Sequence, residues 1–240
     1  MKTTLADHQL HFLRQIALFS DLSDDNVRTL ALDLRSRQYK KGQTIFHQGD
    51  LNCELYIVYK GRIRVYHINP AGEETSVDIL GEGGILGEFS ALDSLPRSAT
   101  VEALRPCTLL ELSQAKLHAY MLTMPQLAIA LSKQVVSKAR WTTKYAEITA
   151  RLDTKSKLLR LLLRYNEQFG RELEPGIRYE VDLGLTQEEL ASFAGSSRSW
   201  VSRISSDWRK RGLIDFRART GKVTILDLPR IEEFQRQIVN

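Results

Sequence analysis

The segment Gly87–Thr100, GEFSALDSLPRSAT, brings together four chemical groups that suit a cyclic sugar-phosphate. The Arg97 guanidinium and Ser98 hydroxyl can donate to a phosphate monoanion, the Glu88 carboxylate can accept from a ribose hydroxyl, and Gly87 lets the backbone approach closely. A surface ion pair between Arg97 and Glu88 is the simpler alternative. The residue types therefore predict either a small charged pocket or an exposed salt bridge.

A second group of residues suits DNA. Thr186 and Glu189 have the spacing of a capping box, which predicts the start of a helix that Gly195 ends. Ser196 or Ser197 then caps a second helix. Helix, glycine-containing turn and helix are typical of a helix-turn-helix, and Ser196–Lys222 holds eight basic against two acidic residues.

The second helix has two different faces. Val201, Ile204 and Trp208 share an apolar face, and the predicted DNA face carries Arg198, Ser199, Ser202 and Arg203. Arginine suits guanine O6 and N7, whereas Gln187 at the start of the first helix suits a phosphate. The alternative is an ordinary solvated helix face. Beyond it, a strand pair around RTGK predicts a basic wing, with Arg217, Arg219 and Lys222.

The elements before this region predict a β-roll and a long helix. Eight glycines punctuate residues 38–112, between short runs of β-branched and aromatic residues, and Ser23 suits the cap of a preceding short helix. Residues 117–152 hold no glycine and predict one long helix with an apolar stripe, namely Leu127, Leu131, Val135, Tyr145 and Leu152. This stripe suits either a second copy of the chain or the helix's own domain. Thr142 and Thr143 lie in the same stripe, and polar groups at a seam between helices cost stability unless they find hydrogen-bond partners.

Composition restricts the class of protein. The 240 residues suffice for two domains, and the absence of a long apolar run or a leader predicts a cytoplasmic protein that is not in the membrane. The two cysteines predict neither a disulfide framework nor a metal cluster. His8 and His11 have no obvious third metal ligand, and no nucleotide-hydrolysing or protease motif occurs. We therefore expect no metal and no catalysis.

From end to end, the chain resembles the cyclic-AMP receptor protein branch of the bacterial transcription regulators that also include the fumarate and nitrate regulators. The resemblance is carried by Gly87, Glu88, Arg97, Ser98 and Ala99, which are similar to that branch's phosphate-binding cassette. It implies an α+β fold with a nucleotide-binding β-roll (1–125), a dimerisation helix and hinge (126–152) and a winged helix-turn-helix (153–240). It also implies homodimers, palindromic operator DNA and RNA polymerase as partners.

The resemblance further assigns residues to the ligands. Phe89 joins the cassette, Thr142 contacts the base from the same subunit, and Thr143 contacts it from the partner. Binding would lengthen the coiled coil and turn both recognition helices toward the spacing of the major groove. Ser197 joins the DNA face. Ser199, already on that face, stands where the branch usually has a glutamate, so we expect a half-site other than TGTGA.

The effector stays open at this point. Cyclic AMP is expected from the resemblance, but cyclic GMP would present the same ribose-phosphate, and threonine hydroxyls can serve either purine. Cyclic GMP, response to both nucleotides and ligand-independent regulation remain the alternatives.

Overall fold

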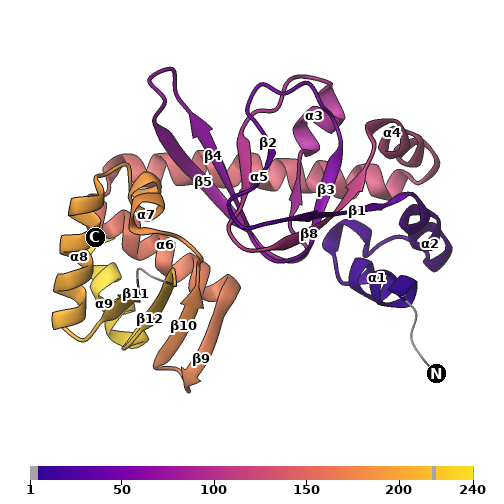
Figure 1. Ribbon diagram of the computed structural model, residues 1–240. Helices are drawn as coiled ribbons and strands as arrows, with labels where there is room; N and C mark the ends of the chain where they lie inside the picture. Colours follow the sequence, from indigo (N-terminus) through magenta and orange to yellow (C-terminus); the bar gives the residue numbers. More distant parts are fainter. Residues whose placement is uncertain (1–4, 218–219, 240) are drawn as a thin grey trace. The chain divides into compact units, whose positions relative to one another are not determined.

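A computed structural model describes the backbone of residues 5–217 and 220–239, with side chains except those of 5–8, 144–151 and 236–239. The chain divides into two compact units (Figure 1). One contains Met1–Gly72 and Val77–Thr143, and the other contains Glu73–Ser76 and Lys144–Asn240. The predicted boundaries at 125 and 152 remain a prediction, because the long helix contributes residues to both units.

The first unit is built on two four-stranded antiparallel sheets, ordered β1-β8-β3-β6 and β2-β7-β4-β5. Their strands are β1 (Arg35–Tyr39), β2 (Thr44–Phe46), β3 (Leu55–Lys60), β4 (Ile63–Ile68), β5 (Glu74–Leu80), β6 (Ile85–Leu86), β7 (Thr100–Ala103) and β8 (Cys107–Leu112). The predicted β-roll is therefore present.

Strand β3 shows how one sheet serves two cores. Tyr56 and Val58 join the core shared by the two sheets, whereas Leu55 and Ile57 point to the opposite face and pack against helices. Successive side chains of a strand point to opposite faces, so a strand buried on both faces reads as a continuous apolar run. The covering helices are α1 (Leu5–Arg14), η1 (Ala17–Phe19), α2 (Asp24–Asp33), α4 (Gln114–Thr123) and the first part of α5. Ser23 caps α2 as predicted.

The predicted continuous helix from Leu117 is wrong in one respect, because two helices occupy this stretch. Helix α4 ends at Thr123, Met124 leaves the helical conformation with φ −128° and ψ 76°, and α5 (Pro125–Arg151) begins at the proline. Proline fits the first turn of a helix, where its missing N–H removes no hydrogen bond. The proline that marks the boundary in the sequence therefore starts the long helix.

The apolar stripe of α5 faces its own domain over its first two turns. Leu127 and Leu131, assigned from the sequence to a seam, are fully buried among the helices and sheet of the first unit, and Val135 is half-buried. The exposed face instead carries Ile129 and Val136, which are 56% and 50% exposed. Of the two alternatives left open by the sequence, Leu127 and Leu131 follow the second, because they pack on the helix's own domain.

The second unit is a helix-turn-helix with a four-stranded antiparallel sheet ordered β11-β12-β10-β9. Its elements are α6 (Thr154–Phe169), β9 (Gly170–Glu174), β10 (Arg178–Asp182), α7 (Gln187–Ala194), α8 (Arg198–Lys210), β11 (Ile214–Arg217), β12 (Lys222–Ile225) and α9 (Leu228–Val239). Helices α6 and α7 pack on each other and α8 packs on α7, as Figure 1 shows. No helix among the described residues is both long and apolar enough to cross a bilayer.

Candidate functional site

Gly87 forms a tight joint between strand β6 and the short helix α3 (Glu88–Asp93). Its φ of 78° lies in the left-handed region that favours glycine, and it caps α3. A Cβ at this position would lie 2.6 Å from the carbonyl oxygen of Glu54 and would also collide with the Arg97 guanidinium. Glycine is thus required by conformation and by the space around Arg97.

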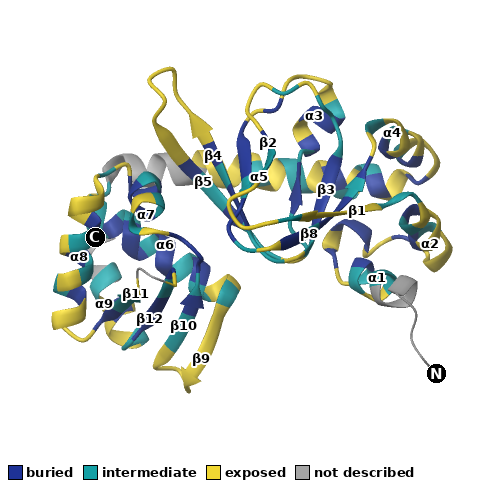
Figure 2. Ribbon diagram, viewed as in Figure 1, coloured by how far each residue is buried: buried dark blue, intermediate teal, exposed yellow. Residues whose placement is uncertain are grey.

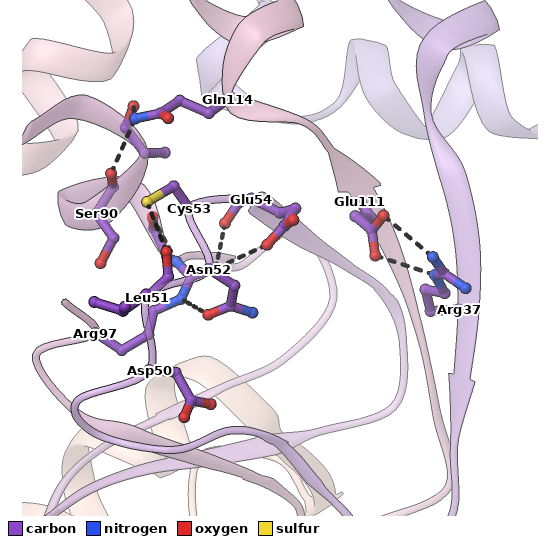
Figure 3. Close-up of polar contacts among 12 residues, drawn as sticks. Arg37, Asp50, Leu51, Asn52, Cys53, Glu54, Ser90, Arg97, Glu111 and Gln114 are labelled. Carbon is purple, nitrogen blue, oxygen red and sulfur yellow. Dashed lines mark hydrogen bonds and ion pairs between the residues drawn. The ribbon is translucent and has the colours of Figure 1, made fainter. Parts of the chain in front are cut away.

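Arg97 is held by the protein on all sides of its guanidinium (Figure 3). Nε donates to Asn52 Oδ1 at 2.9 Å, Nη1 to the Gly87 carbonyl at 3.0 Å, and Nη2 to the Glu54 carbonyl at 2.8 Å. The residue is only 2% exposed, and its guanidinium carbon lies 4.2 Å from the centre of the Phe46 ring. Burial lowers the pKa of Arg97 from its usual value. The predicted phosphate ligand is therefore also a structural residue.

Glu54 brings a carboxylate to the same guanidinium. Its Oε2 lies 3.6 Å from Arg97 Nη2, and among the described residues nothing donates a hydrogen bond to this buried oxygen. The Glu54 side chain as a whole is 34% exposed. An anion of the protein therefore already stands beside the cation that the sequence assigns to a phosphate.

Glu88 is buried to 4% exposure and forms an ion pair with a residue that the sequence reasoning missed. Lys138 Nζ, on helix α5, lies 2.8 Å from Glu88 Oε1 and also donates to the Ile85 carbonyl at 2.8 Å. The simple alternative of an Arg97–Glu88 pair is wrong, since Arg97 and Glu88 have different partners. The sequence does contain a signal for Lys138: it lies one helical turn before Thr142, so the two residues share one face of α5.

The remaining predicted nucleotide contacts are exposed. Ser98 is exposed beside Arg97, and Phe89 is 40% exposed on α3. Thr142 and Thr143 are exposed and donate their hydroxyl protons to the carbonyls of Lys138 and Ala139, at 2.9 and 3.0 Å. Such bonds to the preceding turn leave the oxygen lone pairs available to another donor.

Helix α4 holds the other end of α3. Gln114 Nε2 donates to the carbonyls of Ser90 and Ala91 and to Ser94 Oγ, the last at 2.8 Å, and His118 Nε2 lies 2.8 Å from the same Ala91 carbonyl. Figure 3 shows the Gln114 contact with Ser90. The Ala91 carbonyl is one that a helix end leaves open, whereas the Ser90 carbonyl also accepts from the Ser94 N–H, so these bonds fix the second end of α3.

The helix-turn-helix has the predicted caps. Thr186 and Glu189 form the full capping box of α7, with bonds of 2.5 and 3.1 Å, and Gly195 ends the helix with φ 58°. Of the two candidate caps for α8, the structure uses Ser197, whose hydroxyl accepts from the Trp200 N–H at 3.3 Å. Gln187 begins α7 and is half-buried.

Helix α8 separates its two faces as expected (Figure 2). Val201, Ile204 and Trp208 are at most 3% exposed, whereas Arg198, Ser199 and Arg203 are exposed and Ser202 is half-buried. Ser199 also lies 2.9 Å from the Ser197 hydroxyl, so it is engaged in the cap region. The face predicted to meet DNA is therefore available on α8.

The wing is present, but Lys222 is occupied. Strands β11 and β12 pair antiparallel with Arg217 opposite Lys222. Lys222 Nζ bonds Glu180 Oε1 at 3.0 Å, and Arg171 approaches the same oxygen at 3.1 Å. These partners lower the pKa of Glu180, with the Lys222 hydrogen bond as the largest cause. Lys222 thus supports the sheet, and Arg219 lies outside the described residues.

No group of three His, Cys, Asp or Glu side chains able to hold a metal ion occurs in the part of the chain that the structure describes. The side chain of His8 lies outside that part.

Comparisons with known proteins agree with this architecture. Residues 36–123 match the cyclic nucleotide-binding domain, and residues 156–234 match the Crp-like helix-turn-helix domain. A cyclic AMP receptor protein from Thermus thermophilus is 28% identical over 90% of this chain and 95% of its own length. A global nitrogen regulator from Synechococcus elongatus is 29% identical over 76% of this chain and 82% of its own.

The solved structure of FixK2 from Bradyrhizobium japonicum shares the fold, with a TM-score of 0.72 at 17% identity over 83% of this chain and 96% of that one. The family is identified by the two domain types in this order and by the match to the Thermus thermophilus receptor protein over most of both chains. The chain belongs to the cyclic-AMP receptor protein and fumarate-nitrate regulator family, whose members are DNA-binding transcription regulators and not enzymes.

Proposed function

We propose that this regulator is a homodimer whose affinity for palindromic operator DNA is set by a cyclic purine nucleotide, with cyclic AMP as the effector. Arg97 and Ser98 would hold the phosphate, Glu88 the ribose hydroxyl, and Thr142 and the partner subunit's Thr143 the base. Gly87 supports this assignment, because the space that a Cβ would fill is next to the Arg97 guanidinium. The relative named for cyclic AMP matches over nine tenths of this chain, which favours that nucleotide.

The observation that carries the proposal is the link from Glu88 to Lys138. It joins the nucleotide cassette, at the start of α3, directly to helix α5 through an ion pair of 2.8 Å. A ribose hydroxyl that donates to the Glu88 carboxylate would share it with the Lys138 ammonium or displace that ammonium toward the Ile85 carbonyl, and so would alter the contact between cassette and helix. A ligand shifts an equilibrium only through such differential contacts.

The exposed side of α5 supports the dimer. Residues Ala128, Ile129, Ser132, Lys133, Val136, Ser137 and Arg140 line a shallow trough along this helix. Ile129 and Val136 are seven residues apart, which is the repeat of a helix that pairs with another helix. A second copy of α5 fits this face, because it would cover both exposed apolar side chains at once.

Ligand-independent regulation is the second candidate, and one observation favours it. The guanidinium of Arg97 already donates to three protein groups and lies beside the Glu54 carboxylate. A chain that satisfies its own phosphate-binding arginine could adopt its DNA-binding conformation unaided. RNA polymerase remains the partner that the family resemblance implies for an activator.

The test measures binding of the full chain to a pool of palindromic operators by fluorescence anisotropy, at one fixed salt concentration. The titrations contain no nucleotide, cyclic AMP or cyclic GMP. Tightening with cyclic AMP alone is the expected result, and tightening with cyclic GMP alone would replace the effector. Specific binding that neither nucleotide changes would support the ligand-independent candidate. Lys138→Met should lower the response to nucleotide, while Lys116→Met, which removes an exposed lysine of α4 that pairs with Asp33, should leave it unchanged.

A further inference from the structure

The first turn of helix α8 carries an indole on its surface. Trp200 is 41% exposed, while Trp208 on the same helix is 3% exposed and packs in the core of its own unit. Figure 2 shows α8 with exposed residues along its outer side. A large apolar side chain left in water adds little to folding, and Trp200 lies three residues before Arg203 on the helix predicted to meet DNA, so its ring is available for binding.

One contact places the residue and another places its ring. The backbone N–H of Trp200 donates to the capping hydroxyl of Ser197, so this residue lies in the first helical turn. The guanidinium carbon of Arg203 lies 5.9 Å from the Trp200 ring centre, within reach of a cation–π interaction. Trp200 and Arg203 therefore form one aromatic and guanidinium pair on the outer surface of α8.

The floor of the major groove offers one apolar group, the C5-methyl of thymine, and side chains that read it do so by apolar contact. Side chains three positions apart on a helix have Cβ atoms about 5 to 6 Å apart, which corresponds to one or two base steps of about 3.4 Å. A residue paired with Arg203 thus reaches a base close to the one that Arg203 reads. The neighbouring Ser199 is short and engaged with Ser197, so it leaves room at this position.

We propose that Trp200 is a specificity-determining residue that contacts the C5-methyl of a thymine within two base pairs of the guanine read by Arg203. The proposal rests on DNA binding by the helix-turn-helix and on the assigned role of Arg203. It does not depend on which nucleotide, if any, controls the protein. The indole supplies the apolar contact, and its stacking on Arg203 keeps the guanidinium directed toward the groove.

Uracil substitution tests the proposal, since uracil differs from thymine only by the methyl group. An operator is selected with the wild-type full chain, under whichever nucleotide condition gives specific binding. Each thymine is then replaced by uracil, in one half-site and in both. Binding is measured for wild type, Trp200→Phe and Trp200→Ala, with Arg203→Ala locating the guanine. Thermal unfolding and circular dichroism check that each variant is folded.

For the wild type, loss of one methyl contact should weaken binding about fourfold in one half-site and about 15-fold in both. The sensitive thymine should lie within two base pairs of the guanine at which Arg203→Ala loses discrimination. Trp200→Phe should keep this sensitivity because it keeps an apolar ring, and Trp200→Ala should lose it.

Equal affinity of the wild type for thymine and uracil at every position would overturn the proposal. So would unchanged uracil sensitivity in Trp200→Ala, or an equal loss by that variant on operator and random DNA, which would indicate a contact with the sugar-phosphate backbone. A fall in affinity for Trp200→Phe on every DNA would point to the indole N–H and would also overturn it. Operator binding that ignores cyclic nucleotides would contradict only the proposed effector and leave the thymine contact standing.

Discussion

Neutralising Glu54 should tighten nucleotide binding, because its carboxylate competes with a phosphate for Arg97. Glu54 Oε2 lies 3.6 Å from Arg97 Nη2, and it receives no hydrogen bond from any described residue. A phosphate held by the same guanidinium through bonds of about 2.9 Å would bring a second negative charge within about 5 Å of this carboxylate. The Glu54→Gln variant removes the repulsion and keeps the size of the side chain.

The magnitude follows from Coulomb's law. Two unit charges about 5 Å apart at an effective dielectric constant of about 20 repel by about 3 kcal/mol. The Glu54 side chain is 34% exposed, so solvent screening reduces the net effect to about 1 kcal/mol. We therefore expect Glu54→Gln to lower the Kd for the nucleotide about fivefold.

Isothermal titration calorimetry of the full chain with cyclic AMP and with cyclic GMP measures this directly. Glu111→Gln is the matched control, because Glu111 pairs with the exposed Arg37 in the same sheet (Figure 3) and its loss should leave the Kd unchanged. Unchanged affinity in Glu54→Gln would show that this carboxylate does not oppose the ligand. Weaker affinity would show that Glu54 helps to hold it, and either result would refute the reasoning.

Three further predictions follow from other parts of the structure. Val136→Asp places a charge on the exposed face of α5 and should convert the dimer to monomers, as measured by light scattering. The control Leu122→Asp changes a residue that is 85% exposed on α4 and should leave the dimer intact. A dimeric Val136→Asp variant would contradict the proposed interface. Arg203→Ala should weaken operator binding by about 1 to 3 kcal/mol, while Lys222→Ala should have a smaller effect because the Lys222 ammonium is held by a carboxylate of the sheet. The reverse order in anisotropy titrations would contradict this and make Lys222 the larger contributor to DNA binding. Asp153→Ala removes the cap of α6 and should lower the free energy of unfolding by about 1 kcal/mol at pH 7. Hydrogen bonding by Ser156 lowers the pKa of Asp153. The contribution of Asp153 to the free energy of unfolding is therefore complete above about pH 4 and is lost as the pH falls through the pKa of the folded state. Denaturant unfolding in which the stability difference between wild type and Asp153→Ala increased below pH 4 would contradict this sign.

The structure also changes how an arginine substitution is interpreted. From the sequence, Arg97→Ala should abolish nucleotide binding in a folded dimer. Arg97 is buried, however, and its loss would remove the donor to the Glu54 carbonyl and one of the two donors to the Gly87 carbonyl, which also accepts from the Ala91 N–H. Removing one partner of a buried hydrogen bond costs about 1 to 3 kcal/mol per group, so the variant would lose stability as well as ligand. Ser98→Ala is the cleaner test of the pocket, because Ser98 is exposed.

Much of the fold could be predicted from the sequence, because its signals are local. The capping box at Thr186, the left-handed Gly195 and the serine caps depend on a few neighbouring residues, and each appears where the sequence predicts it. The glycine-punctuated strands of the β-roll are equally local. The residues of the cassette could be named in the same way, since one short segment carries all of them, and their role as nucleotide ligands stays a prediction.

The tertiary structure decided which residues from distant segments contact one another. Periodicity placed Leu127 and Leu131 on one stripe of α5 but could not tell whether a second copy or the chain's own sheet would cover it, since both burials need the same spacing. The charges in the sequence do not show which carboxylate pairs with which cation, because the chain has many of both. The fold brings distant strands and helices together and thereby forms the Glu88–Lys138 and Glu180–Lys222 pairs. It also places Glu54 beside Arg97. The sequence determined which chemical groups this protein carries, and packing determined which of them already have partners.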